Sequence, residues 1–291
     1  MPSTISVIVP FYKGNQYLSQ LFSSIEAALP ICEEENTQLE VILVNDSPDV
    51  TVELPMQLNV HTRVISNEQN MGIHGTRLHG LEYASGDWIL FLDQDDEILL
   101  PGFRMQLQLR NGVDVVVGNG LYEYGTQHFP IYRSEKAMKY LIQAKNFLRI
   151  RNLIPSPGCC LVRKDAIPAC WKNSPMKCNG SDDWLLWLLL FQESRRFACN
   201  YGQVYIHNDA DGNNLSFNLE KMHQSNLELW KILEGSGQFS DRELKWLDHS
   251  IHFKFYQDTK QLDLKKLIKY TSTILCNVRY KLTCVFLGRC T

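Results

Sequence analysis

The feature that most constrains this chain is a run of three carboxylates, Asp93, Asp95 and Asp96, directly after the apolar stretch 88–92. An uninterrupted apolar stretch of this length predicts a buried strand. In open α/β sheets, ligands bind at the carboxyl ends of the strands. Neighbouring carboxylates repel one another, and burying them is costly unless a cation lies close by. The run therefore indicates either a site for Mg²⁺ or Mn²⁺, which prefer oxygen ligands, or a solvated acidic turn.

Strands and helices alternate over the first part of the chain. Apolar or β-branched runs at 5–9, 39–44, 63–65 and 88–92 predict strands, apolar residues at helical spacing predict helices near 18–29 and 73–84, and the polar stretch 30–38 predicts a loop. This alternation predicts an α/β fold with a mostly parallel central sheet and flanking helices. Three of the strands end in polar groups, at Tyr12, at Asp46 and at the acid run. We expect these groups to meet at one edge of the sheet.

The second half of the chain is less regular. It predicts strands at 113–117, 159–163 and 203–206, and helices over 134–150 and 184–191. From about residue 219 onward, helical patterns dominate. We therefore predict a catalytic domain over 1–216 and a helical C-terminal extension over 217–291.

The composition excludes several classes of protein. The chain has 291 residues, of which 44% are hydrophobic, and its net charge of -3 gives no support to a nucleic-acid partner. Its nine cysteines form no C-x-x-C pair, which argues against zinc and for reduced thiols. We expect no signal peptide, and the longest apolar run, 184–191, is too short to span a membrane. We therefore expect a cytoplasmic protein.

Residues 5–100 resemble the family-two glycosyltransferases, which use nucleotide-sugars and have the A-type fold. The likeness rests on blocks in matching order and spacing: Val7-Ile8-Val9-Pro10-Phe11-Tyr12, Glu40-Val41-Ile42-Leu43-Val44-Asn45-Asp46-Ser47, Asn70-Met71-Gly72, Ala84-Ser85-Gly86-Asp87 and Asp93-Gln94-Asp95-Asp96. Asn45 and Pro48 depart from the residues usual in the second block. The likeness is looser over 150–216 and absent beyond it.

The resemblance implies a UDP-sugar donor and a divalent cation, Mn²⁺ or Mg²⁺. The residues that would bind the nucleotide are Pro10, Tyr12, Asp46, Arg77 and Asp93, with Asp46 accepting from the uracil N–H and Asp93 holding the ribose. Asp95 would bind the metal, and His207 would complete the metal site. For Tyr12 and His207, an ordinary structural role is the alternative.

Transfer with inversion requires a base that deprotonates the acceptor hydroxyl. The sequence Asp182-Asp183-Trp184 resembles the family's acidic pair before an aromatic helix. By this likeness Asp183 is the base and Asp182 its neighbour. The alternative is that both acids only stabilise the start of the helix.

The acceptor is expected to be a saccharide. Family analogy implies a lipid-linked one, used in bacterial surface-polysaccharide synthesis. Ser156, Pro157 and Gly158 are expected on the acceptor side, together with the aromatic segment that contains Tyr122, Tyr124, Phe129 and Tyr132. Those aromatic residues are equally compatible with a hydrophobic core.

The C-terminal helices combine apolar and basic residues. Leu264, Leu267, Ile268, Thr271 and Leu275 share one helical face, and Lys265, Lys266 and Lys269 lie off it. We expect the apolar face to pack on the catalytic domain. The alternative is a peripheral contact of 262–291 with an anionic membrane on its cytoplasmic face.

Other readings of the acid run remain open at this point. An aspartate-dependent phosphohydrolase also places Asp-x-Asp after a strand, although usually after the first one. A nucleotidyltransferase would need a glycine-rich basic loop near the N-terminus, where Gly14 stands alone. A carbohydrate-binding relative without activity would not need Asp46, Asp93, Asp95 and Asp183 together.

Overall fold

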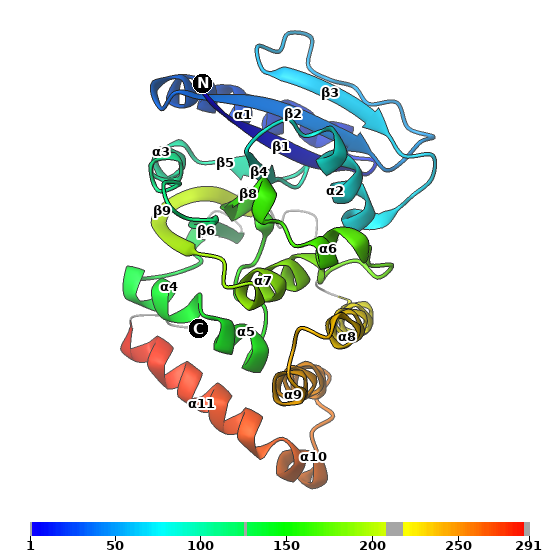
Figure 1. The fold of residues 1–291 in the computed structure, drawn as a ribbon, viewed down its shortest axis with the longest axis vertical. Coiled ribbons are helices and arrows are strands. Elements are labelled where there is room, and N and C mark those ends of the chain that lie inside the picture. The colour runs from blue at the N-terminus through cyan, green and yellow to red at the C-terminus, as the bar shows by residue number, and fades with distance from the viewer. Residues whose placement is uncertain (1, 125–126, 208–217, 288–291) are drawn as a thin grey trace. The chain divides into compact units, whose positions relative to one another are not determined.

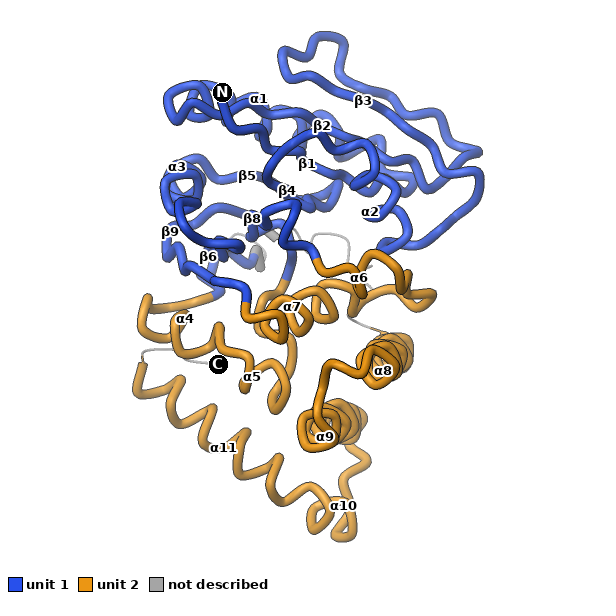
Figure 2. Tube along the Cα trace, viewed as in Figure 1, with its two compact units in different colours: residues 1–131, 156–167, 195–211 blue, residues 132–155, 168–194, 212–291 orange. Residues whose placement is uncertain are grey.

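The structure is a computed structural model that describes residues 2–124, 127–207 and 218–287. The chain forms two compact units, each assembled from three segments (Figure 2). Unit 1 comprises residues 1–131, 156–167 and 195–211, and unit 2 comprises 132–155, 168–194 and 212–291. The predicted boundary at residue 216 is a single cut in the sequence, and that domain assignment stays a prediction.

Unit 1 is built on one mixed sheet (Figure 1). Its strands are β1 (Ser3–Phe11), β2 (Thr37–Asn45), β3 (His61–Ser66), β4 (Trp88–Phe91), β5 (Glu97–Ile98), β6 (Val115–Tyr124), β7 (Gln127–Pro130), β8 (Cys160–Arg163) and β9 (Phe197–His207). They follow the order β3-β2-β1-β4-β8-β6-β9-β5, and β7 pairs with β6. Only β5, β7 and β8 run against the common direction. The predicted α/β class with a mostly parallel sheet is confirmed.

The sheet core explains why the strands form where they do. Ile5, Val7, Ile8 and Val9 of β1 are fully buried, as a central strand covered on both faces requires. The predicted end of β6 at 117 is wrong, because the strand continues through Gly118-Asn119-Gly120. Its register with β9 shifts at both of these peptide steps. Glycines inside a strand accommodate such bulges, so the strand bends there and does not end.

Among the described residues, the α-helices of unit 1 are α1 (Asn15–Glu34), α2 (Gly72–Tyr83) and α3 (Leu100–Gln108). The predicted loop over 30–38 is wrong for its first half, because α1 continues through Pro30 to Glu34. Its buried face extends to Ala28 and Cys32, so tertiary packing overrides the local polarity. α3 was not predicted. It is a short helix, and its buried residues are Gly102, Phe103, Gln106 and Leu107.

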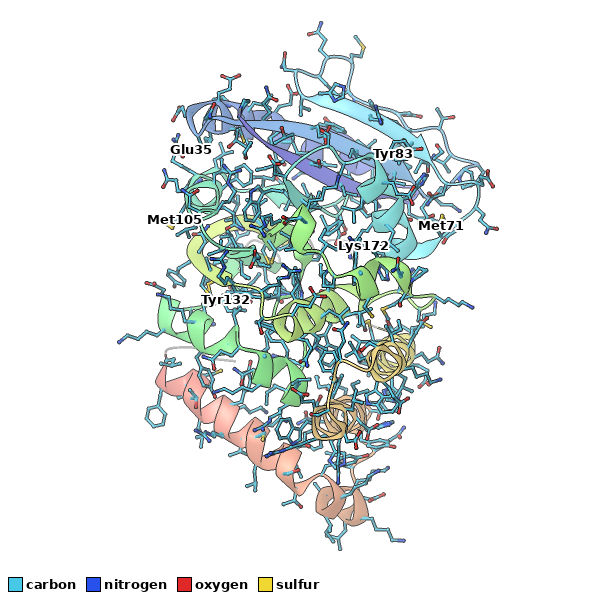
Figure 3. All side chains as sticks on the ribbon, in the orientation of Figure 1. Glu35, Met71, Tyr83, Met105, Tyr132 and Lys172 are labelled. Carbon is cyan, nitrogen blue, oxygen red and sulfur yellow. The ribbon has the colours of Figure 1, made fainter. Side chains whose placement is uncertain are left out.

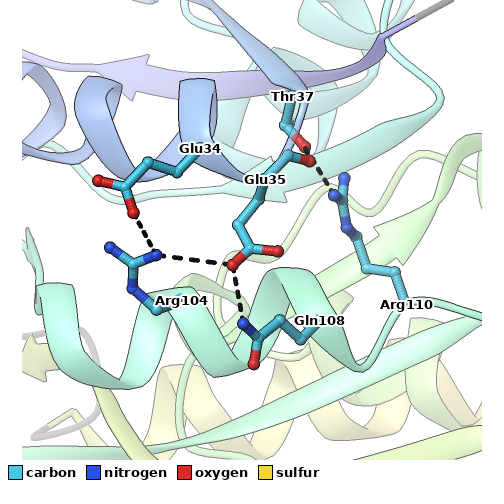
Figure 4. A network of polar contacts seen from close by, with 6 residues as sticks. All are labelled: Glu34, Glu35, Thr37, Arg104, Gln108 and Arg110. Carbon is cyan, nitrogen blue, oxygen red and sulfur yellow. Dashed lines mark hydrogen bonds and ion pairs between the residues drawn. The ribbon is translucent and has the colours of Figure 1, made fainter.

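A polar network connects the end of α1 to α3 (Figure 4). Arg104 lies 2.6 Å from Glu34 and 3.6 Å from Glu35, and the Gln108 amide donates to Glu35. Arg110 donates to the Thr37 hydroxyl at 2.7 Å. Exposed ion pairs contribute little stability on their own, but these contacts set the position of the helix that follows the acid run.

Unit 2 is helical. It contains α4 (Glu135–Leu141), α5 (Ala144–Arg149), α6 (Ala169–Asn173), α7 (Asp182–Gln192), α8 (Leu219–Ser236), α9 (Asp241–Asp258), α10 (Leu264–Lys269) and α11 (Thr271–Phe286). The predicted single helix over 134–150 is two helices, because Ile142 and Gln143 leave helical geometry. α6 was not predicted. Within the residues described, no helix is both long enough and apolar enough to cross a membrane.

Candidate active site

Asp46 organises the edge of the sheet where β2 ends. Its carboxylate accepts hydrogen bonds from the Asn67 amide at 2.7 Å and from the backbone N–H groups of Met71 at 2.7 Å and Gly72 at 3.1 Å. Gly72 has a φ of 73°, a conformation that favours glycine. Asp46 is only 5% exposed, and it stabilises the positive end of α2, the helix between Met71 and Tyr83 in Figure 3.

The contacts of Asp46 bear directly on its predicted role. A carboxylate offers about four lone-pair sites. The three donors already in place leave room for about one more hydrogen bond, such as one from a uracil N–H. Asn67, which sequence reasoning missed, also contacts His79 through its side-chain oxygen at 2.6 Å. Asp46 as a nucleotide ligand stays a prediction.

The acid run forms a turn at the carboxyl end of β4. Asp93 accepts a hydrogen bond from the Arg77 guanidinium at 2.6 Å, and the Asp96 N–H donates to the Asp93 carbonyl. Arg77 is 4% exposed and lies over the Phe91 ring, whereas the Asp93 side chain is 36% exposed. The buried guanidinium holds the Asp93 carboxylate in place, and the exposed part of that carboxylate can accept a hydrogen bond from a ligand hydroxyl. The structure thus brings the predicted residues Arg77 and Asp93 together.

Gln94 ties this turn to the end of β1. Its side-chain oxygen accepts from the Tyr12 N–H at 2.9 Å, and its side-chain amide donates to the Tyr12 carbonyl at 3.2 Å. A Cβ on Gly14 would lie 2.2 Å from the Gln94 oxygen, so the contact requires a glycine there. The Tyr12 side chain is 50% exposed, so the alternative of a core position for Tyr12 is wrong. Pro10, the other predicted nucleotide contact on β1, is partly buried in the strand.

Asp96, the last acid of the turn, lies near Tyr205, and the two were not predicted to interact. Both are buried. Burial raises the pKa of the Tyr205 phenol well above its ordinary value, and the nearby Asp96 carboxylate adds to this rise. A side-chain hydrogen bond with Ser156 opposes it. The Tyr205 ring also lies against Gly158.

The donor set of the turn fits a hard divalent cation in chemistry. Asp95 is partly exposed and carries carboxylate oxygens, the ligand type that Mg²⁺ and Mn²⁺ prefer. The backbone of His207 pairs with Tyr122 at the end of β9, but its side chain lies outside the described residues. In the part of the chain that the structure describes, no group of three or more His, Cys, Asp or Glu side chains could hold a metal by itself.

Asp182 and Asp183 lie in unit 2, in the first turn of α7, and both are buried. The Asp183 carboxylate accepts from the Asn152 amide at 2.8 Å and from the Trp184 N–H at 2.7 Å. The hydrogen bond from the Trp184 N–H fits the alternative, in which the acid only stabilises the start of the helix. The hydrogen bond from the Asn152 amide is a tertiary contact that orients the carboxylate and that capping does not need. The Asp182 carbonyl accepts from the Trp171 indole.

The aromatic segment divides into two kinds of residue. Tyr132 is fully buried in unit 2 and donates to the Leu153 carbonyl, so the acceptor-side prediction is wrong for Tyr132 (labelled in Figure 3). Tyr122 and Phe129 are exposed and face each other across the β6–β7 hairpin. The side chain of Tyr124 lies outside the described residues. Ser156 accepts from the Gly158 N–H, which shapes the loop before β8 together with Pro157.

The fold is that of the A-type glycosyltransferases, and sequence comparison gives the family. Residues 6–171, more than half of the chain, match the sequence model of Glycosyl transferase family 2. The chain belongs to this family. Membership sets aside the phosphohydrolase and nucleotidyltransferase readings of the acid run.

Two curated relatives illustrate the sequence similarity. A dolichol-phosphate mannosyltransferase of Pyrococcus furiosus is 29% identical over 56% of this chain and 47% of its own length, so the chain spans about half of that relative. The GalNAc(5)-diNAcBac-PP-undecaprenol beta-1,3-glucosyltransferase of Campylobacter jejuni is 26% identical over 83% of this chain and 78% of that protein.

Solved structures confirm the fold. S. aureus TarS 1–349 in complex with UDP-GlcNAc aligns with a TM-score of 0.65 and 17% identity, over 93% of this chain and 79% of that one. The mannosyltransferase PcManGT of Pyrobaculum calidifontis, in complex with GDP-Man and Mn²⁺, aligns with a TM-score of 0.54 and 13% identity, over 100% and 77% of the two chains. At such identities the likeness concerns the fold alone.

Proposed function

We propose that this protein transfers a sugar from a UDP-sugar to a saccharide acceptor with inversion at the anomeric carbon, in a metal-dependent reaction. The observation that carries the proposal is the acid turn at the end of β4, with Asp93 ion-paired to the buried Arg77 and with Tyr12 tied to the same turn through Gln94. A partly exposed aromatic ring can stack on a base and a carboxylate turn can hold a cation, while the buried Arg77 keeps Asp93 in place beside the nucleotide.

On the donor side, Tyr12 would stack on the uracil, Asp46 would accept its N–H, and Asp93 would hold the ribose. Asp95 would hold the cation, with His207 as a second ligand. When bound, the cation neutralises the diphosphate and stabilises it as a leaving group. The Mn²⁺ in the PcManGT complex supports this choice of ion.

On the acceptor side, Asp183 would act as the base. It takes the proton of the acceptor hydroxyl while that oxygen forms its bond to the anomeric carbon, and UDP leaves as the old bond breaks. Inversion follows because a single displacement attacks the face opposite to the leaving group. Asn152, which donates to Asp183 at 2.8 Å, would keep the carboxylate oriented.

The acceptor is proposed to be a lipid-linked saccharide used in bacterial surface-polysaccharide synthesis. The printed name of the Campylobacter relative describes transfer to a saccharide on diphosphoundecaprenol, and that relative aligns over most of both chains. The reaction would take place on the cytoplasmic side, where nucleotide-sugars are made.

Two variants of the whole chain test the proposal, with UDP titrated by calorimetry in the presence and absence of Mn²⁺. Asp95→Ala should lose the metal-dependent part of UDP binding, because it removes the proposed metal ligand. Asp183→Asn should keep UDP binding but lose turnover of a UDP-sugar by about 10²–10⁴-fold, the usual effect of removing a general base.

Matched controls are available for both variants. Asp165→Ala removes an exposed acid whose partner is Arg163, and it should leave UDP binding unchanged. Asp182→Asn tests whether the correct acid of the pair was chosen. UDP affinity that is independent of Mn²⁺ in the unmodified protein, or equal loss of UDP affinity in Asp95→Ala and Asp183→Asn, would contradict the proposal.

A further inference from the structure

The C-terminal helix α11 has two opposite faces that are both apolar. The inner face contributes Tyr280 and Cys284, which are buried. On the outer face, apolar side chains recur at helical spacing and are between 49% and 88% exposed: Leu275, Val278, Leu282, Val285 and Phe286. The short helix α10 before it also exposes apolar side chains, those of Leu264, Leu267 and Ile268. We call the outer face of α11 together with these three residues the C-terminal stripe.

The expectation that this apolar face packs on the protein is wrong. Four of the residues named for it, Leu264, Leu267, Ile268 and Leu275, are exposed. The packing is instead made by Tyr270, which is buried between the two helices and contacts the rings of His249 and Phe253 of α9. Tyr270 and Tyr280 are thus the buried aromatic anchors of this segment, and the aliphatic residues named above are exposed.

The stripe is presented by an anchored helix, not by a frayed end. At its start, α11 is held by the Tyr270 contacts with α9. At its end, the Leu287 carbonyl accepts a hydrogen bond from the Ser134 hydroxyl at 2.5 Å, and Ser134 also caps α4. Within unit 2, α11 also packs against α9. A rigid helix with one face already packed has its outer face available for a partner.

Within the stretch 264–291 the charges are of one sign, and Asp263 just before it pairs with Lys266. From residue 264 to residue 291 the sequence contains six Lys or Arg residues and no Asp or Glu, although the whole chain carries a net charge of -3. Arg279 and Lys281 are exposed and flank the outer face on its two sides. Long basic side chains beside an apolar stripe can keep their charges in water while the stripe is buried.

We propose that α10 and α11 dock on an anionic membrane surface, with the C-terminal stripe in the boundary between headgroups and acyl chains. Apolar burial and attraction to anionic lipids act together in such a contact. A second copy of this chain is a poorer partner, because pairing two stripes would bring cations together with no acid in the segment to balance them. The surface would place the enzyme at the lipid-linked acceptor of the proposed function, but the inference itself rests on exposure and charge.

Co-sedimentation with vesicles tests this directly, using the full chain. We expect binding to vesicles of phosphatidylglycerol and phosphatidylcholine in equal parts, at least tenfold weaker binding to phosphatidylcholine alone, and loss of binding at about 1 M salt, where the Debye length falls to about 3 Å. Arg279→Gln with Lys281→Gln should weaken binding about 30-fold, from the usual contribution of two cations near such a surface. Leu282→Ser with Phe286→Ser should weaken it at least tenfold.

The controls match these variants in charge and in polarity. Lys231→Gln with Lys245→Gln removes two exposed cations of α8 and α9, and Met56→Ser removes a fully exposed apolar side chain of unit 1. Neither should change vesicle binding more than about twofold. All variants alter exposed residues, and their melting temperatures should stay unchanged.

Three outcomes would overturn the inference. They are absence of vesicle binding, equal binding to neutral and anionic vesicles, and a dimer in sedimentation velocity that Leu282→Ser with Phe286→Ser dissociates. The last would show that a second copy covers the stripe. Because sedimentation does not depend on turnover, a failure here leaves the proposed transfer reaction intact, and a failure of UDP binding leaves the membrane contact intact.

Discussion

Gln94 lies between two acids of the acid run, Asp93 and Asp95, and its side chain forms hydrogen bonds with the backbone of Tyr12. The paired hydrogen bonds to the Tyr12 backbone span 82 residues and join the ends of β1 and β4. Those two strands are direct neighbours in the sheet. The contact therefore joins the two segments that follow them, at the edge where the donor nucleotide is proposed to bind. Gln94 is thus a positioning residue for Tyr12 and for the acid turn.

We predict that Gln94→Ala weakens UDP binding about tenfold. Each neutral hydrogen bond contributes about 0.5–1.5 kcal/mol, and losing two frees the segment that carries Tyr12. Calorimetric titration with UDP and Mn²⁺ measures the effect. The matched control is Gln20→Ala, which removes another glutamine hydrogen-bonded to a neighbour of the acid run, Glu97, and should leave UDP affinity unchanged. Equal losses in the two variants would show that Gln94 has no special role.

At the scale of elements, the hairpin β6–β7 and the end of β9 form a continuous ladder. Phe129 lies opposite Tyr122, and Tyr122 pairs with His207 across the next strand boundary. Residues directly opposite on neighbouring strands have their side chains on the same face. The exposed rings of Tyr122 and Phe129 therefore form an aromatic surface on the carboxyl side of the sheet, where a sugar ring could stack.

We predict that Tyr122→Ala with Phe129→Ala lowers kcat/KM for the saccharide acceptor about tenfold while UDP affinity stays the same. An aromatic contact is typically worth about 0.5–1.5 kcal/mol, and two are removed. Steady-state kinetics at saturating donor measures this. Tyr201→Ala, which removes an exposed ring elsewhere on β9, is the control. A parallel loss of UDP affinity would place these rings on the donor side instead.

At the scale of the whole molecule, the chain crosses between its units several times, and unit 2 includes segments from both sides of residue 216. α8 and α9 make specific contacts with the earlier segments of this unit. Glu228 accepts from the N–H groups of Lys177 and Cys178, and Arg149 lies over the Trp246 ring at 3.6 Å. α7, which holds Asp183, packs against α5 and α8 in the same unit.

We predict that a chain ending at residue 216 does not retain a folded unit 2. Removing α8 and α9 would expose apolar side chains, each costing about 1.5–3 kcal/mol, against a typical net stability of about 5–15 kcal/mol. Thermal melts followed by circular dichroism, with a dye that binds exposed apolar surface, would compare the truncated and full chains. A truncated chain that melts cooperatively near the full-length temperature and binds no dye would support the predicted boundary at 216.

The sequence by itself determined the features that local pattern encodes. Buried strands such as 5–9 and 88–92, the shared edge where Tyr12, Asp46 and Asp93 lie, and the family all follow from apolar runs, turn residues and the order of motifs. These features depend on residues that are close together in the chain, and a buried strand must be apolar wherever it is placed.

The tertiary structure alone decided features that depend on distant partners. β5 is two residues long and exists because Glu97 and Ile98 pair with Ile206 and Tyr205, more than a hundred positions away. Distant partners also decided the three hydrogen bonds to Asp46 and the paired hydrogen bonds between Gln94 and Tyr12. They likewise decided that the outer face of α11 is exposed. A local pattern shows that a helix has an apolar face, but the surface against which the helix packs decides which face is buried. Here Tyr270 and Tyr280 are buried, and the aliphatic face is exposed.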